Sequence, residues 1–228
     1  MRADSPVPDE RMRIDLHLHT RGSWDCLSDP EAVLERAWSR GIERIAITDH
    51  NRLAVAASMA NRYPDRVIAG EEVKTAEGID VIGLYLENEI PKGTPAVDVC
   101  RRIREQGGIV YLPHPFARGK GGDGRLARSL LPYLDVVEVF NSRLRSRKRN
   151  QRALELARES GLLQGAGSDA HTIGEIGNAW VELPRHPSDP ESLREALRRA
   201  TVHGRRAGLH VRLASNWAKL RKSVTRAS

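Results

Sequence analysis

Short apolar segments alternate with helical segments along most of this chain, and this alternation restricts the fold more than any other feature. The apolar segments lie at residues 13–20, 44–48, 66–70, 109–112, 135–139, 162–166 and 178–183, and residues 79–86 are expected to form a hairpin strand. Strands joined through helices by short connections form right-handed βα units and a parallel sheet. About seven such strands suit a closed α/β barrel better than an open sheet.

The first apolar segment carries two histidines at its end. Ile14, Leu16 and Leu18 alternate with polar residues at a spacing of two, which is typical of a strand with one apolar face. His17 and His19 are then expected to project from the opposite face, side by side. Two neighbouring imidazoles can share a metal ion, although a histidine pair alone equally fits a polar surface.

Later strands also end in residues that can bind metal ions. The residues at or just beyond these strand ends are Asp25, His50, Glu72, His114, Asp169 and His171. In α/β barrels the carboxyl ends of the strands meet at one rim, where active sites lie. The joint pattern therefore predicts a polynuclear metal centre.

Composition limits the class of protein. The net charge of +7 and the pI near 9.8 fit either arginine-rich solvated helices or a nucleic-acid partner, and we favour the helices. No apolar run approaches the ~18 residues that cross a membrane, and two cysteines form no disulfide framework. We expect a cytoplasmic protein with no membrane partner. We also expect a disordered leader (1–10), one barrel domain (11–203) and a basic C-terminal helix or tail packed on the barrel (204–228).

The motifs in this order resemble the PHP (polymerase and histidinol phosphatase) family. They are His17-Leu18-His19-Thr20, Thr48-Asp49-His50, Gly70-Glu71-Glu72-Val73, Pro113-His114-Pro115, Val137-Glu138-Val139-Phe140-Asn141 and Gly167-Ser168-Asp169-Ala170-His171. The resemblance covers residues 13–185. It implies a distorted seven-stranded, TIM-like (β/α)7 barrel and a metal-dependent phosphoesterase. It also implies two or three divalent metal ions, which would be Mn, Zn or Fe.

The resemblance assigns ligands position by position. His17, His19, Glu72 and Asp169 correspond to ligands of a first ion. Glu72 would bridge to a second ion held by His114, and Asp25, His50 and His171 correspond to ligands of a third. Glu71, next to Glu72 on the same strand, should point the other way.

One departure from the family pattern concerns the second ion. Members with three ions supply a further histidine or cysteine after the strand at 135–139, and residues 141–150 contain neither. Arg143 and Arg145 could bind phosphate there or form part of a solvated helical turn. Glu138 and Asn141 are expected to line the substrate pocket.

The implied reaction is hydrolysis of a phosphate ester by a metal-activated hydroxide. Asp169 and His171 are the candidates for proton transfer. A small phosphorylated molecule, such as a nucleotide or a histidinol-phosphate-like monoester, is the favoured substrate.

Other functions fit the same residues. One is an exonuclease acting on single-stranded nucleic acid, which the positive charge would favour. A second is amidohydrolase chemistry, which would need a bridging carboxylated lysine, and Lys74 is the nearest lysine to Glu72. A third is a barrel that only binds ligands. The sequence does not specify the oligomeric state.

Overall fold

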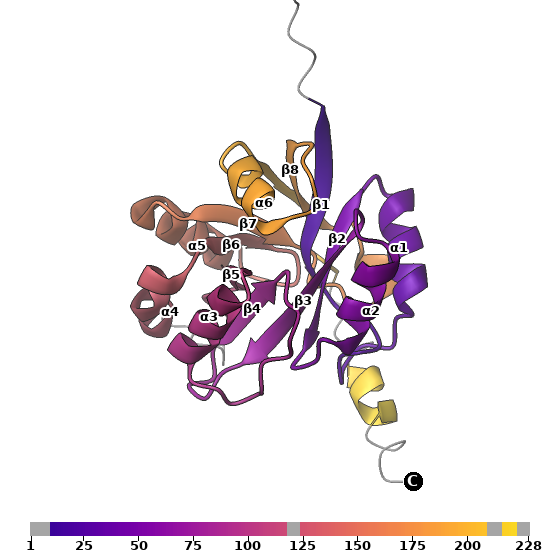
Figure 1. The fold of residues 1–228 in the computed structure, drawn as a ribbon, viewed down its shortest axis with the longest axis horizontal. Helices are drawn as coiled ribbons and strands as arrows, with labels where there is room; N and C mark the ends of the chain where they lie inside the picture. The colour runs from indigo at the N-terminus through magenta and orange to yellow at the C-terminus, as the bar shows by residue number, and fades with distance from the viewer. Residues whose placement is uncertain (1–9, 118–123, 209–215, 223–228) are drawn as a thin grey trace, which may run out of the picture.

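A single curved sheet of nine strands forms the centre of the molecule in the computed structural model, which describes residues 10–117, 124–208 and 216–222 (Figure 1). The strands are β1 (Arg11–Leu18), β2 (Arg44–His50), β3 (Val67–Lys74), β4 (Asp80–Leu84), β5 (Ile109–Leu112), β6 (Val136–Asn141), β7 (Leu163–Gly167), β8 (Ala179–Pro184) and β9 (Thr201–Gly204). Their order in the sheet is β7-β6-β5-β4-β3-β2-β1-β8-β9.

Helices cover the outside of this sheet. They are α1 (Pro30–Ser39), α2 (Ala54–Arg62), α3 (Ala96–Glu105), α4 (Arg125–Leu130), α5 (Arg147–Ser160) and α6 (Pro190–Leu197), with short 3₁₀ turns at Leu131–Tyr133 and Ile173–Glu175. In Figure 1, α1 and α2 flank the sheet on the right, and α3, α4 and α5 flank it on the left. Asp29 caps the N-terminus of α1, where its carboxylate accepts hydrogen bonds from the amides of Glu31 and Ala32. Helix α5 ends at Gly161, whose φ of 65° suits glycine.

The strand directions are mixed, not uniformly parallel. The pairs β1–β2, β2–β3, β5–β6 and β6–β7 are parallel. Strand β4 runs antiparallel to both β3 and β5, as its predicted hairpin requires. Strand β8 runs antiparallel to β1, and β9, which was not predicted, extends the sheet beyond it. The sheet therefore has nine strands, not the seven of the expected (β/α)7 barrel.

The sheet curls until its first and seventh strands meet. Leu18 at the end of β1 forms a parallel bridge with Ala170, which lies just after β7. The amide of Asp169 donates to the carbonyl of His17 at 2.7 Å, and the amide of His19 donates to the carbonyl of Ala170 at 2.9 Å. These contacts give a barrel-like sheet and place the ends of β1 and β7 side by side.

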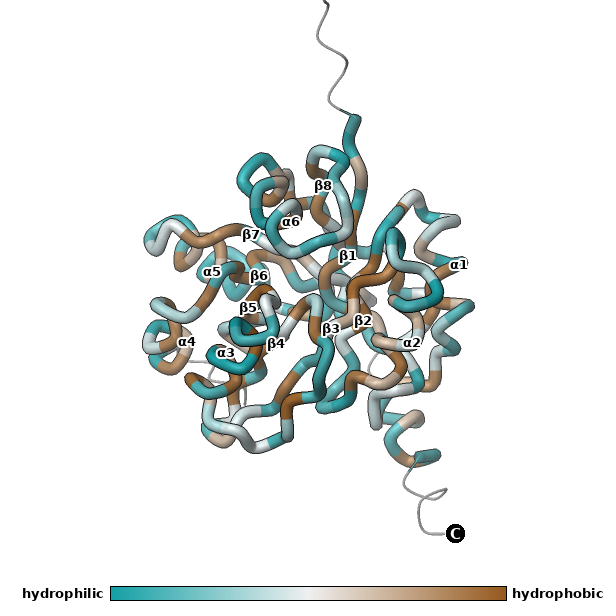
Figure 2. The backbone as a smooth tube through the Cα atoms, viewed as in Figure 1, coloured by the Kyte–Doolittle hydropathy of each residue, from teal (hydrophilic) through white to brown (hydrophobic). Residues whose placement is uncertain are grey.

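Two apolar clusters fill the inside and the outside of the curled sheet, and Figure 2 shows hydrophobic residues along the strands. The expected alternation along β1 is interrupted, because the register shifts between Asp15 and Leu18. Ile14 and Leu16 therefore pack in one cluster and Leu18 in the other, so the prediction of one apolar face is wrong. Bulges of this kind redirect side chains next to functional sites.

Close packing around β7 makes Gly165 a sensitive position. A Cβ atom there would lie 2.4 Å from Cε2 of the buried Tyr111. Gly165→Ala is expected to lower the free energy of unfolding by about 1–3 kcal/mol through overpacking. Urea denaturation would measure this, with Gly174→Ala as the control, because a Cβ at Gly174 meets nothing within 4 Å. Equal stability of the two variants would contradict the packing described.

The chain ends bear on two predictions. The predicted leader (1–10) lies outside the described residues except for Glu10, and so does much of the predicted basic tail. Residues 216–222 are helical, and Lys222 Nζ donates to the carbonyls of Arg21 and Ser23. Among the described residues, no helix is long and apolar enough to span a membrane.

Candidate metal centre

The carboxylate of Glu72 is the point at which the histidines from several strands meet. Its Oε2 lies 3.3 Å from His17 Nε2, 3.4 Å from His19 Nε2 and 3.0 Å from His50 Nδ1. Its Oε1 lies 3.1 Å from His114 Nε2. Glu72 is fully buried, and β2 places His50 directly beside it in the sheet register. One carboxylate therefore lies between four imidazoles.

Asp169 lies on the other side of the histidine pair. Its Oδ1 is 3.8 Å from His17 Nε2 and 3.4 Å from His19 Nε2. The two imidazole Nε2 atoms are themselves 3.2 Å apart. Two carboxylates and two imidazoles thus face one another in a space that a single cation could occupy.

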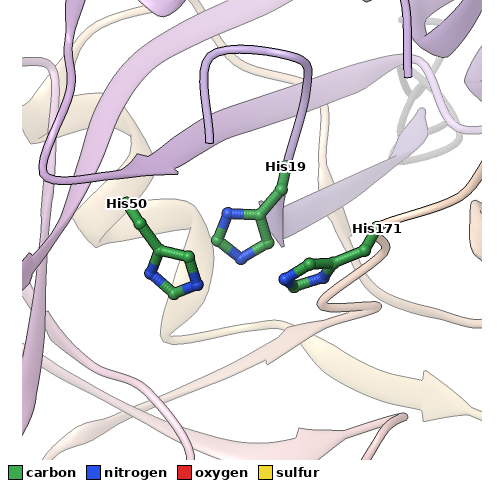
Figure 3. A group of neighbouring side chains, drawn as sticks. All are labelled: His19, His50 and His171. Carbon is green, nitrogen blue, oxygen red and sulfur yellow. The ribbon is translucent and has the colours of Figure 1, made fainter. Parts of the chain in front are cut away.

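Asp25 and His171 form a second group with His19 and His50, next to the first. The rings of His19, His50 and His171 point toward one another (Figure 3), with the His19 ring centroid 4.5 Å from His50 and 4.3 Å from His171. Asp25 Oδ2 lies 3.3 Å from His171 Nε2 and 3.8 Å from His50 Nε2. The eight residues that the sequence singled out as metal ligands are therefore all within one cluster.

The backbone at two strand ends holds uncommon conformations. His114 has a φ of 29° and Asp169 a φ of 52°, in the left-handed region that disfavours side chains. The His114 amide donates to Glu138 Oε2 at 2.7 Å, and the Asp169 amide donates to the His17 carbonyl at 2.7 Å. Strain of this type persists where surrounding contacts enforce it, commonly at functional sites.

Glu138 is hydrogen-bonded to several residues of the candidate metal centre. Its Oε1 accepts from His17 Nδ1 at 2.9 Å and from the Tyr111 hydroxyl at 3.2 Å. Its Oε2 accepts from the amide of His114 and, at 2.9 Å, from Asn141 Nδ2. Asn141 Nδ2 also lies 3.2 Å from Asp169 Oδ2. Both Glu138 and Asn141 are buried, and their hydrogen bonds orient the candidate metal ligands His17, His114 and Asp169.

Replacing Glu138 with glutamine should weaken the centre without removing a ligand. The glutamine amide cannot accept from all four donors, so His17 loses its fixed ring orientation. We expect metal affinity or activity to fall roughly 10–100-fold, as for other groups that orient metal-bound histidines. Metal titration of both proteins would measure this. Unchanged affinity would show that Glu138 does not position His17.

The histidines differ in protonation. Burial lowers the pKa of His17, but the carboxylates of Glu138, Asp169 and Glu72 outweigh this and hold its pKa well above 6.5. Burial, together with the nearby charges of His171 and His50, holds the pKa of His19 well below 6.5. Burial acts to raise the pKa of Asp169, yet the His17 charge and a hydrogen bond from His19 keep it well below 3.8. Metal binding would release the proton from His17.

Glu71 faces away from this cluster, as strand alternation predicted. Its Oε2 accepts from the amide of Ile90 at 2.9 Å. Burial raises the pKa of Glu71 to about 7 from 4.5. Between these pH values the unfolded chain releases a proton that the folded protein keeps, so rising pH destabilises the fold.

A Glu71→Gln variant should therefore be insensitive to this effect. As the pH rises from 5 to 8, we expect the free energy of unfolding of this variant to increase by roughly 2–3 kcal/mol relative to that of the wild type. Urea denaturation at the two pH values would test this. An equal pH dependence of both proteins would contradict the raised pKa.

The residues fit divalent metal ions. Four groups of three have ligand atoms within 4.8 Å of one another: His17–His19–Glu72, His17–His114–Asp169, His19–His50–His171 and Glu72–Asp80–His114. All the donors are nitrogen or carboxylate oxygen, which suit Zn, Mn and Fe. Asp25 Oδ1 is buried without a hydrogen-bond partner among the described residues, as expected of an oxygen placed for a cation.

A cavity of about 360 Å³ opens onto this cluster. Asp25, His50, Asp169 and His171 form one part of its wall, and Trp24, Lys92, Arg143 and Lys219 are among the others. A larger cavity of about 900 Å³ lies between α5, β6 and β9, and none of its lining residues is an imidazole or a carboxylate. We therefore place the chemistry at the smaller cavity.

The two arginines singled out by sequence have different positions. Arg143 lines the cavity, with Nη1 2.8 Å from His171 Nδ1 and Nε 2.9 Å from Glu175 Oε1. Arg145 is exposed and is absent from the cavity lining, and its carbonyl accepts from Arg206.

Sequence reasoning missed several residues of the site. Trp24, Lys92 and Lys219 line the cavity, and Asp80 joins a ligand group. Asp80 begins β4, within the hairpin strand predicted at 79–86, and the short turn before that strand brings this carboxylate close to Glu72. Lys219 gave no signal, because it lies far from every motif in the sequence.

Comparison with known proteins places these observations in a family. A family model described as PHP-associated matches residues 147–202. An uncharacterized protein of Methanocaldococcus jannaschii is 39% identical over 179 residues, which is 75% of this chain and 70% of that protein. A 5′-3′ exoribonuclease of Haemophilus influenzae is 30% identical over 100 residues, which is 41% of this chain and 36% of that protein.

A solved structure shows the same fold. It is a protein of Bifidobacterium adolescentis provisionally described as a metal-dependent phosphoesterase, with a TM-score of 0.58, 18% identity, and coverage of 86% of this chain and 97% of that chain. The family match, the relatives and the shared fold agree with the order of motifs along the sequence. The chain belongs to the PHP (polymerase and histidinol phosphatase) family.

Proposed function

We propose that the protein is a metal-dependent phosphoesterase that hydrolyses a small phosphate ester. The observation that carries this proposal is the convergence of His17, His19, His50 and His114 on the single carboxylate of Glu72. Divalent ions bound there would supply positive charge for the phosphoryl oxygens and a more acidic water. The fold shared with a protein described as a metal-dependent phosphoesterase supports the same chemistry.

The protein's own groups would hold the phosphate and move protons. Arg143 lies on the cavity wall, where its guanidinium can bind a phosphoryl oxygen. Asp169 and His171 both line the cavity and are the candidates for proton transfer, and Arg143 Nη1 lies 2.8 Å from His171 Nδ1.

The cavity favours a small substrate. A volume of about 360 Å³ lies at the lower end of the usual range for small-molecule sites. Trp24 is 44% exposed beside His50, and Lys219 Nζ lies 4.5 Å from the centre of its ring. With Lys92, these residues offer a flat apolar surface and positive charge to the part of the substrate beyond the reacting phosphate.

A second candidate is hydrolysis of nucleic acid. A neighbouring cavity of about 620 Å³ shares Trp24, His50 and Lys92 with the first and adds Arg52. An exposed tryptophan with nearby cations is a common platform for stacked bases. The similarity to the H. influenzae exoribonuclease supports this reading over 100 residues.

Amidohydrolase chemistry is less well supported. Lys74 Nζ lies 3.3 Å from Asp80 Oδ1 and donates to the carbonyl of Gly78 at 2.5 Å. These contacts place Lys74 in an ion pair with Asp80, whereas a bridging carbamate would carry a negative charge that the Asp80 carboxylate would repel.

The test is a substrate screen with purified protein loaded with Mn²⁺. Phosphomonoesters of different size, single-stranded oligonucleotides and simple amides would be compared for product release. We expect phosphate release from small monoesters that depends on added metal. Release of nucleotides from oligonucleotides alone would favour the second candidate, and the absence of any metal-dependent phosphoester hydrolysis would contradict the proposal.

A further inference from the structure

The cavity of about 900 Å³ between α5, β6 and β9 carries a different charge from the metal centre. The charged residues among its described lining are Arg147, Arg158, Arg205 and Arg206, and none is an aspartate or a glutamate. We call this cavity the arginine groove. A concave surface with four guanidinium groups and no carboxylate favours an anionic ligand, and the fork of N–H donors on each guanidinium suits phosphate. The proposed hydrolysis uses none of these four residues.

Neighbouring side chains do not neutralise the arginine groove. Among the described residues, no carboxylate forms an ion pair with any of the four arginines. Arg205 Nε donates to Asn178 Oδ1 at 2.8 Å, and Arg206 Nη1 donates to the carbonyl of Arg145 at 2.8 Å, so both acceptors are uncharged. Residues 143–158, which include α5, contain seven basic residues and one acidic residue. Much of the positive charge of the chain is therefore gathered beside this groove.

The charges extend along the groove. Arg147, Gln151, Leu154 and Arg158 line it from α5 at spacings of three and four residues, so they share one face of the helix. With a rise of about 1.5 Å per residue, the two arginines lie about 16 Å apart along the helix axis. The opposite wall is β9 with the two arginines that follow it. A single phosphate group cannot contact both ends of the groove, whereas a chain of phosphate groups can.

Apolar and amide groups lie between the charged walls. Phe140 from β6, Leu154 from α5, Val202 from β9 and Gln164 from β7 line the groove, and all four are half-buried. An aromatic ring beside positive charge is a platform on which a nucleobase can stack. The bases of a single strand are free to make such contacts, whereas those of a duplex are paired and stacked. The lining therefore suits a single strand better than a duplex.

We propose that the arginine groove binds single-stranded nucleic acid, with its arginines on the backbone phosphates and Phe140 against a base. The groove is a separate site, since it shares no described lining residue with the cavity at the metal centre. Binding here goes beyond the proposed hydrolysis of a small ester and does not require it. The loop after β6 connects the two sites, because it places Arg143 in the metal-centre cavity and leads into α5 at Arg147.

The test is fluorescence anisotropy of a labelled single-stranded oligonucleotide with the full-length protein over a range of salt concentrations. Gel electrophoresis would confirm that the oligonucleotide stays intact. The double variant Arg147→Gln, Arg158→Gln removes two arginines that form no ion pair among the described residues, so the fold should be kept. We expect roughly 10-fold weaker binding. The slope of log K against log[salt] should also fall in magnitude by about 1.4, since each phosphate contact contributes about 0.7.

Two further variants show whether position and stacking matter. Arg101→Gln with Arg102→Gln makes the same change in net charge at exposed positions on α3, and it should keep the wild-type affinity and slope. Phe140→Leu should weaken binding without changing the slope, because stacking releases no counterions. The two groove variants should keep the wild-type Mn²⁺ content and the hydrolysis of small monoesters. Failure of this binding and failure of the proposed function would therefore appear in different assays.

Several results would overturn the inference. The wild-type protein could fail to bind the oligonucleotide, or the groove double variant could bind it with unchanged affinity and slope. Equal weakening by the α3 double variant would show that net charge alone attracts the strand. Equally tight binding of a duplex of the same length, or of inorganic polyphosphate, would show that bases make no contact in the groove.

Discussion

Replacing Glu72 with glutamine is expected to reduce metal-dependent hydrolysis by roughly 10²–10³-fold. The carboxylate lies within 3.4 Å of four imidazoles, and no other described side chain makes these four contacts. Removing one partner of a buried charged group costs about 3–5 kcal/mol, and each 1.36 kcal/mol in a barrier is a factor of ten. Steady-state kinetics together with metal content would show whether the loss follows the metal.

Glu71→Gln is the matched control for this substitution. The two glutamates are adjacent on β3, equally buried and identical in chemistry, but Glu71 contacts the amide of Ile90 instead of the histidines. We expect Glu71→Gln to keep its metal and its activity within a few-fold. Comparable losses in both variants would show that the effect arises from disturbing β3 and not from losing a ligand.

Removing the metal ions is expected to lower the melting temperature by roughly 5–10 °C. Ions bound about 100-fold above their dissociation constant stabilise a fold by about 2.7 kcal/mol, and each kcal/mol shifts Tm by about 2–4 °C for a chain of this size. The cause is direct: the buried carboxylates of Glu72 and Asp25, and the largely buried carboxylate of Asp169, would lose their compensating cations. Thermal unfolding with and without EDTA would measure the shift.

The reversal of this shift separates metal loss from other effects of the chelator. Adding Mn²⁺ in excess should restore both the melting temperature and the activity of the wild-type protein. Glu72→Gln should show a smaller response to EDTA, because part of its metal is already lost. A melting temperature that does not change on chelation would contradict a metal centre that contributes to stability.

Much of the fold follows from local patterns in the sequence. The apolar run Ile109–Leu112 was predicted as a strand and forms β5 with the same ends. The hairpin strand at 79–86 became β4, whose antiparallel direction follows from its short connection to β3. Strand β9 was missed, because its four residues Thr201–Gly204 are partly exposed and carry no apolar pattern.

The positions of the candidate metal ligands could also be anticipated, since they lie near the ends of strands or in the loops that follow, and strand ends meet at one rim. The path of β1 could not, because the register shift between Asp15 and Leu18 depends on contacts with other strands. The supporting role of Glu138 required the three-dimensional arrangement of Tyr111, His114 and His17 around its two oxygens. Contacts between residues that are far apart in the sequence produce no local sequence pattern from which they could be predicted.

The central claim is that imidazoles and carboxylates from separate strands hold divalent cations around Glu72. The most direct measurement is anomalous diffraction at the manganese absorption edge from crystals grown with Mn²⁺. We predict anomalous peaks between Glu72 and the group formed by His17, His19 and Asp169. A fully active, Mn²⁺-soaked crystal with no peak among these side chains would contradict the account.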